Sequence, residues 1–160
     1  MNATIEQVFQ DELVTATTEV FSTMVFTEVQ PGKPILGEAP RAGTNVVGTI
    51  AFTGKTNGLV LFYGSFEAAK QITASMLGME AAEVGDEMHD AIGELTNMIA
   101  GSFRTRIAHA CNETWAISVP TVTVGSDFYT KFVTEVQRLL CPFTMGNHEV
   151  FVELIVTKRN

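Results

Sequence analysis

Two acidic residues and an asparagine lie close together in the sequence at spacings that place them on one face of a helix. Asp90, Glu94 and Asn97 lie four and three residues apart, with Gly93 between the two acids and Gly101 four residues after Asn97. At about 100° per residue, the two acids, the amide and Gly101 fall within about 60° of one another on a helix. An amide beside a carboxylate offers donors, an acceptor and a negative charge on one rigid surface. Such a surface suits side chains that reach into the site of a partner protein.

The residues on this face are not those that helix stability alone would select. Asp90 and Glu94 are like charges at i, i+4, and no Lys or Arg occurs between Lys70 and Arg104. Asn97 is a poor helix former, and each of the two glycines costs ~1 kcal/mol relative to Ala. A glycine on an exposed helix face lets another backbone approach closely. A solvated helix face is the ordinary interpretation of an isolated Glu and Asn, but this combination favours a functional one.

These side chains need a helix to position them, and the apolar pattern predicts one over residues 86–108. Ile92, Leu95 and Ile99 repeat on the side opposite the polar residues. Periodicity predicts two further helices, over residues 3–24 and 66–77, with Ser65 and Gly78 as the cap residues of the second.

The remaining chain is rich in strand and loop signals. Residues 45–53 and 58–63 are expected to form an antiparallel hairpin, and residues 31–45, which are rich in Pro and Gly, a long surface loop. Further strands are predicted over residues 25–29, 115–124, 131–141 and 149–157. The resulting order of helix, strands, helix, helix and strands indicates an α+β domain, with helices packed on an antiparallel β-sheet.

Length and charge limit the function classes. The chain has 160 residues, 46% of them apolar, which is enough for one domain with its own core. Its formal net charge of -8 has the wrong sign for neutralising nucleic-acid phosphates. The longest apolar runs are strand-sized, far short of the ~20 residues that a membrane helix needs. The two cysteines and the acidic beginning of the sequence fit a reduced, cytoplasmic protein without an export signal.

Conventional catalytic arrangements are missing from the sequence. Neither cysteine, Cys111 nor Cys141, is followed by the Arg that a cysteine phosphatase loop needs, and no metal-ligand cluster or phosphate-binding loop is evident. The three histidines are scattered and are expected to be surface or structural residues. We therefore expect no metal or cofactor to be bound by this chain.

Four residues match a longer signature. Asp90, Glu94, Asn97 and Pro120 satisfy Asp/Ser-x3-Glu-x2-Asn-x22-Pro. The chain thus resembles the CheC/CheX family of response-regulator phosphatases, and within it the CheX branch, which carries the motif once. The resemblance covers most of the chain and implies a single CheX-like domain over residues 1–160. It also implies a CheC-like fold with two pseudo-symmetric halves, each a helix plus strands, and one active site.

The resemblance implies a chemistry as well. Members of the family hydrolyse the aspartyl phosphate of CheY-like response regulators, whose receiver domain supplies its own Mg²⁺ and an active-site lysine. Asn97 would hold the attacking water, and Glu94 would pair with that lysine and align the two proteins. Asp90, Gly93 and Gly101 would contribute to docking the substrate protein. Pro120 would shape the strand beside the helix, and a homodimer formed near the sheet edges is expected.

Two other interpretations of the same helix face remain open. The chain could be a non-catalytic signalling module that binds a receiver domain or another partner through the acidic helix. It could also be a structural dimer in which this face is buried, so that the glycines serve helix packing. Comparing dephosphorylation of a receiver with simple binding separates the first alternative from catalysis, and cross-linking at position 97 tests the second.

Overall fold

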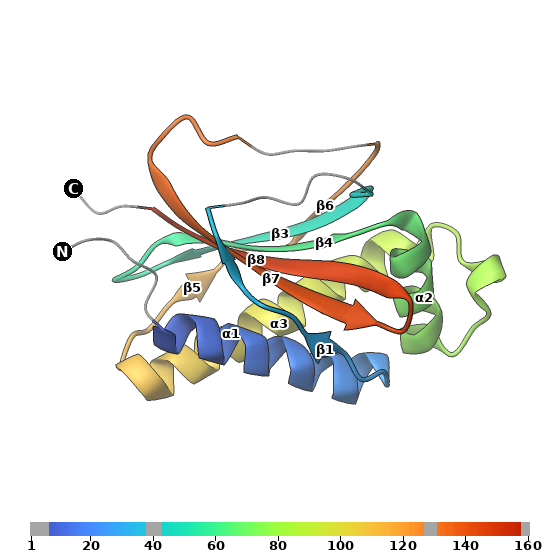
Figure 1. The fold of residues 1–160 in the computed structure, drawn as a ribbon, viewed down its shortest axis with the longest axis horizontal. Helices are drawn as coiled ribbons and strands as arrows, with labels where there is room; N and C mark the ends of the chain where they lie inside the picture. The colour runs from blue at the N-terminus through green and yellow to red at the C-terminus, as the bar shows by residue number, and fades with distance from the viewer. Residues whose placement is uncertain (1–6, 38–42, 127–130, 158–160) are drawn as a thin grey trace.

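The computed structural model describes residues 7–37, 43–126 and 131–157. In this part of the chain, two long helices lie along one face of an antiparallel β-sheet, and a shorter helix lies near one end of it (Figure 1). The long helices are α1 (Gln7–Val20) and α3 (Glu87–Cys111), and the shorter one is α2 (Phe66–Leu77). The predicted α+β class with an antiparallel sheet is confirmed.

The described sheet has eight strands in the order β1-β7-β8-β4-β3-β5, with β2 also paired to β7 and β6 also paired to β3. The strands of the first half are β1 (Gln30–Pro31), β2 (Ile35–Leu36), β3 (Val46–Thr53) and β4 (Gly58–Gly64). Those of the second half are β5 (Ala116–Ile117), β6 (Thr121–Val124), β7 (Val136–Met145) and β8 (His148–Thr157).

The sheet order displays the two pseudo-symmetric halves that were expected. Each half runs from a long helix through a broken edge strand into a hairpin: α1, β1/β2 and β3–β4, then α3, β5/β6 and β7–β8. β4 and β8 pair at the centre, and each broken edge strand pairs with the first hairpin strand of the other half. The two halves are thus interleaved in one sheet, and α1 is the counterpart of α3.

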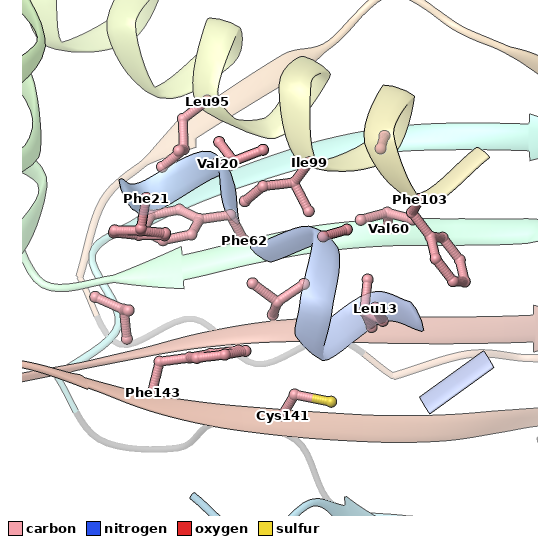
Figure 2. Close-up of a cluster of buried hydrophobic side chains, with 14 of the residues drawn as sticks. Leu13, Val20, Phe21, Val60, Phe62, Leu95, Ile99, Phe103, Cys141 and Phe143 are labelled. Atoms are coloured by element: carbon pink, nitrogen blue, oxygen red, sulfur yellow. The ribbon is translucent and has the colours of Figure 1, made fainter. Parts of the chain in front are cut away.

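The core lies between the sheet and the helices (Figure 2). Phe62 from β4, Phe143 from β7 and Phe103 from α3 are all fully buried there. A smaller apolar cluster, which includes Leu61 and Tyr63, covers the opposite face of the sheet. Alternation along β4 explains the division, since successive side chains point to opposite faces.

The local predictions hold best where the signals are short-range. Ser65 accepts a hydrogen bond from the Ala68 N–H at 3.1 Å, and Gly78 ends α2 with a φ of 66°, as expected for a C-cap glycine. Asn112 ends α3 in the same left-handed region, so this helix extends three residues beyond the predicted end at residue 108. The predicted hairpin corresponds to β3 and β4.

Four local predictions need correction. The strand predicted over residues 131–141 begins only at Val136 and continues to Met145 as β7. Residues 25–29 form no strand, because a π-helical turn (Phe21–Val25) continues α1 and ends at Phe26, whose φ is 58°. The loop expected over residues 31–45 contains the short strand β2 and the end of β1, since both pair with β7. The strand predicted over residues 115–124 is interrupted between β5 and β6. Part of the first predicted helix, residues 3–6, lies outside the described residues.

Candidate functional site

The predicted polar face of α3 points away from the core. Asp90 and Glu94 are exposed and Asn97 is half-buried, whereas Ile92 and Leu95 on the other side are fully buried. The structure thus places the acid and the amide side by side on the outside of a helix whose inner face is anchored in the core. Glu94 and Asn97 therefore lie outside the core, where a partner protein can reach them, as the functional interpretation requires.

The side chains of Glu94 and Asn97 have no bonding partner within the described part of the chain. Glu94 and Asn97 form no side-chain hydrogen bond or ion pair with another described residue. The acids of α1 behave differently, because Glu12 and Glu19 both pair with Arg106 on the inner side of α3. An amide and a carboxylate without internal partners keep their full hydrogen-bonding capacity for an incoming molecule.

The start of α3 adds fixed negative charge next to this face. The Glu87 carboxylate accepts a hydrogen bond from the Gly85 N–H at 2.8 Å. The backbone N–H groups of Glu87 itself and of Gly85 hold the pKa of this carboxyl below its usual range. Glu87 therefore stays ionised at the helix N-terminus, where the macrodipole favours an anion.

Close contact between α3 and β3 fixes how far Asn97 lies from the sheet. Thr96, the preceding residue, is fully buried and packs against Gly48 of β3, where any side chain would overlap the Thr96 hydroxyl. The Thr96 hydroxyl donates to the Ile92 carbonyl at 2.7 Å, which fixes its rotamer. Gly48 is therefore required by the distance between strand and helix. Gly48 carries only a weak sequence signal, a glycine inside a strand pattern, which does not identify it as part of the site.

The two glycines of α3 differ in their surroundings. Gly101 is half-buried, and a Cβ added there would meet no atom within 4 Å, which agrees with a glycine on an open face. Gly93 is buried, and an added Cβ would lie 3.5 Å from Val122 and 3.8 Å from Pro120. The expectation that Gly93 lies on an exposed face is therefore wrong, since the β6 segment covers it.

Pro120 lies where the motif suggested, beside α3 and directly before β6. It falls in the interruption between β5 and β6, where its missing N–H costs no sheet hydrogen bond. Its ring lies near Gly93, on the side of α3 that β6 covers, and not on the polar face. The structure therefore brings all the motif residues together around two turns of α3.

The three histidines lie apart from one another: His89 precedes Asp90 on α3, His109 is near the end of the same helix, and His148 is on β8. His89 and His109 are exposed and His148 is half-buried. Within the described ranges, no group of three or more His, Cys, Asp or Glu residues is arranged to hold a metal ion. In those ranges there is also no helix that is both long and apolar enough to span a membrane.

An antiparallel sheet with helices along one face is the fold that this chain shares with a CheC-like protein of solved structure. Residues 46–144 match the family described as chemotaxis phosphatase CheX. The chain belongs to this family, which confirms the membership and the phosphatase class inferred from the motif.

Individual relatives agree with this assignment. The chain is 28% identical over 140 residues to the CheY-P phosphatase CheX of Thermotoga maritima, covering 87% of this chain and 88% of that protein. A chemotaxis protein CheX from Desulfovibrio desulfuricans is 29% identical with a TM-score of 0.82, covering 92% and 98% of the two chains. A CheX–CheY–BeF3–Mg²⁺ complex from Borrelia burgdorferi matches in fold, with 20% identity, a TM-score of 0.80 and coverage of 94% and 98%.

Proposed function

We propose that this protein hydrolyses the aspartyl phosphate of a CheY-like response regulator. The observation that carries the proposal is the outward, unengaged pair of Glu94 and Asn97 on a helix fixed to the sheet. Membership of a chemotaxis phosphatase family supports it, as does the name of the Thermotoga relative, a CheY-P phosphatase. The Borrelia complex supports a CheY receiver as the partner.

In the proposed reaction, a water oxygen bonds to phosphorus while the bond from phosphorus to the aspartyl oxygen breaks. The products are the aspartate carboxylate and inorganic phosphate, which takes up the atoms of the water. The receiver supplies Mg²⁺ and its active-site lysine, so this chain need not provide a metal. What this chain adds is orientation of the water, worth ~10² in rate.

Asn97 is the residue proposed to hold the water. Its carboxamide donates through nitrogen and accepts through oxygen, so it can fix a water molecule without acting as a base. Glu94, one turn earlier, is proposed to bind the receiver's lysine and set how deeply Asn97 enters. Asp90 and Gly101, on the same open face, are proposed to contact the docked receiver.

The test compares receiver dephosphorylation by the wild type, Asn97→Ala and Glu94→Ala. We expect Asn97→Ala to lower kcat about 100-fold, and Glu94→Ala mainly to weaken receiver binding. Glu67 and Gln71 of α2 offer a matched control, since they are an exposed acid and an exposed amide spaced by one helical turn. Alanine at either control position should leave turnover unchanged. Turnover by Asn97→Ala at the wild-type rate would contradict the mechanism, and binding without turnover by the wild type would favour the non-catalytic alternative.

We also propose that the protein forms a homodimer near its sheet edges. The broken edge strands β1/β2 and β5/β6 leave backbone groups that a second copy can cover. Sedimentation at low micromolar concentration measures the mass directly. A single species of 17.4 kDa would contradict the dimer.

A further inference from the structure

The interruption between β5 and β6 is a β-bulge held by a side chain. Ile117 pairs with Phe52 and Thr121 with Thr49, so three residues on this strand oppose two on β3. Ser118 bridges the extra length. Its N–H donates to the Ala51 carbonyl at 2.9 Å, and its hydroxyl accepts from the Ala51 N–H at 2.9 Å. The same hydroxyl donates to the Val119 carbonyl at 3.0 Å.

This bulge lies along the candidate site. Trp115, before β5, packs on Phe103 of α3 with ring centroids 5.4 Å apart. Pro120, the last residue of the bulge, lies near Gly93, where an added Cβ would be 3.8 Å from its ring. The segment between these two positions therefore runs along α3 between Phe103 and Gly93, the stretch of the helix that includes Asn97.

Val119 is the exposed side chain of this bulge. Its exposed fraction is 80%, although valine is usually buried and the residues on either side are fixed by contacts to β3 and α3. A bulge commonly re-aims a side chain next to a functional site. Here it displays an apolar group, held by the contacts on either side of it, on the segment that runs along α3. A side chain that is already held in place loses little conformational entropy when a partner binds.

We propose that Val119 is an apolar contact for the receiver domain and a determinant of which receiver is accepted. The inference rests on the proposed function, since the occupant is the same receiver that Glu94 and Asn97 engage. A receiver seated on α3 deeply enough for Asn97 to reach its phosphoryl group extends sideways over the flanking bulge. The charged face then recognises the reactive centre, while Val119 recognises the apolar surface around it.

The experiment measures KM and kcat for phosphorylated CheY from this protein's own organism, and Kd for that CheY loaded with BeF3⁻ and Mg²⁺. We expect Val119→Ala to raise KM and Kd about 10-fold and Val119→Asp to raise them further, with kcat at saturation within about 2-fold. Val133 is the matched control, since it is also an exposed valine but follows Phe132, which packs on the opposite face of the sheet. Val133→Ala should change neither constant.

The outcomes separate this inference from the proposed function. Unchanged KM and Kd in Val119→Asp, with an active wild type, would overturn the role of Val119 alone. A wild type that binds the loaded receiver in a Val119-dependent way without turnover would support the contact and remove the hydrolase activity. No binding and no turnover would overturn both. A changed sedimentation coefficient of Val119→Asp without any receiver would assign Val119 to a contact between copies and overturn the inference.

Discussion

Gly48 of β3 and Thr96 of α3 are in direct contact, with no room for a side chain at Gly48. A Cβ there would overlap the Thr96 hydroxyl and lie 3.1 Å from Thr96 Cβ. Asn97 follows Thr96 directly, so this contact sets the position of the proposed water-binding amide relative to the sheet.

Gly48→Ala should therefore lower both stability and turnover. Overpacking of this kind costs about 1–3 kcal/mol, and a displacement of α3 by a fraction of an ångström should reduce kcat at least ~10-fold. Urea unfolding and receiver dephosphorylation measure the two effects. The control is Gly48→Ala combined with Thr96→Ala, which removes the overlapping hydroxyl. The double variant should be more stable than the sum of the single effects predicts, and strict additivity would contradict the contact.

Alanine at the two glycines of α3 should affect receiver binding differently. Gly93→Ala and Gly101→Ala should each stabilise the helix by up to ~1 kcal/mol, since the added methyl group meets either ordinary contacts or open space. Only Gly101 lies on the open face, so only Gly101→Ala should weaken receiver binding if a partner approaches there. Thermal unfolding and the receiver Kd check the pair. Equal Kd values for both variants and the wild type would remove Gly101 from the docking surface.

The sequence was sufficient to predict α3, its polar face and the β3–β4 hairpin, because helical periodicity and turn residues are local signals. It did not predict the burial of Gly93, since the residues that cover it, Pro120 and Val122, lie in and just before β6, about thirty positions later in the sequence. The short strands β1 and β2 were missed for a similar reason. Two residues carry no periodic pattern, and these strands exist through their pairing with β7.

A buried charged cluster was also not predicted. Glu153 is fully buried in β8, accepts from Tyr63 Oη at 2.7 Å, and pairs with Arg138 through Nε and Nη2, both at 2.9 Å. A lone acid within an apolar strand was its only signal. The partners come from β4 and β7, which sequence spacing does not bring together.

Substitutions in this cluster should lower the free energy of unfolding without changing the activity of the folded protein. Glu153→Gln removes the buried carboxylate that both Arg138 and Tyr63 contact and should cost about 3 kcal/mol, whereas Tyr63→Phe should cost about 1 kcal/mol. Denaturant unfolding measures both. The activity of the folded variants should stay at the wild-type level, because Tyr63 lies on the sheet face opposite the helices. As a control, Glu12→Ala removes a half-exposed partner of Arg106 and should cost at most ~1 kcal/mol. Equal losses for Glu153→Gln and Glu12→Ala would show that burial adds nothing to the cluster.

Cys141 makes the stability of the fold sensitive to alkaline pH. Burial, and then the nearby Glu153 charge, raise the pKa of this thiol from its ordinary 9.0 to about 12. The unfolded chain loses the thiol proton above about pH 9, while the folded chain keeps it until about pH 12. The stabilising contribution is therefore fully present below pH 9 and declines as pH rises, by at most ~1.4 kcal/mol per pH unit.

Urea unfolding of the wild type and Cys141→Ala at pH 7.5, 9 and 10 tests this. The variant should start less stable because of the lost side-chain volume, but its stability should fall less between pH 9 and 10. Parallel declines in the two proteins would show that Cys141 ionisation does not contribute.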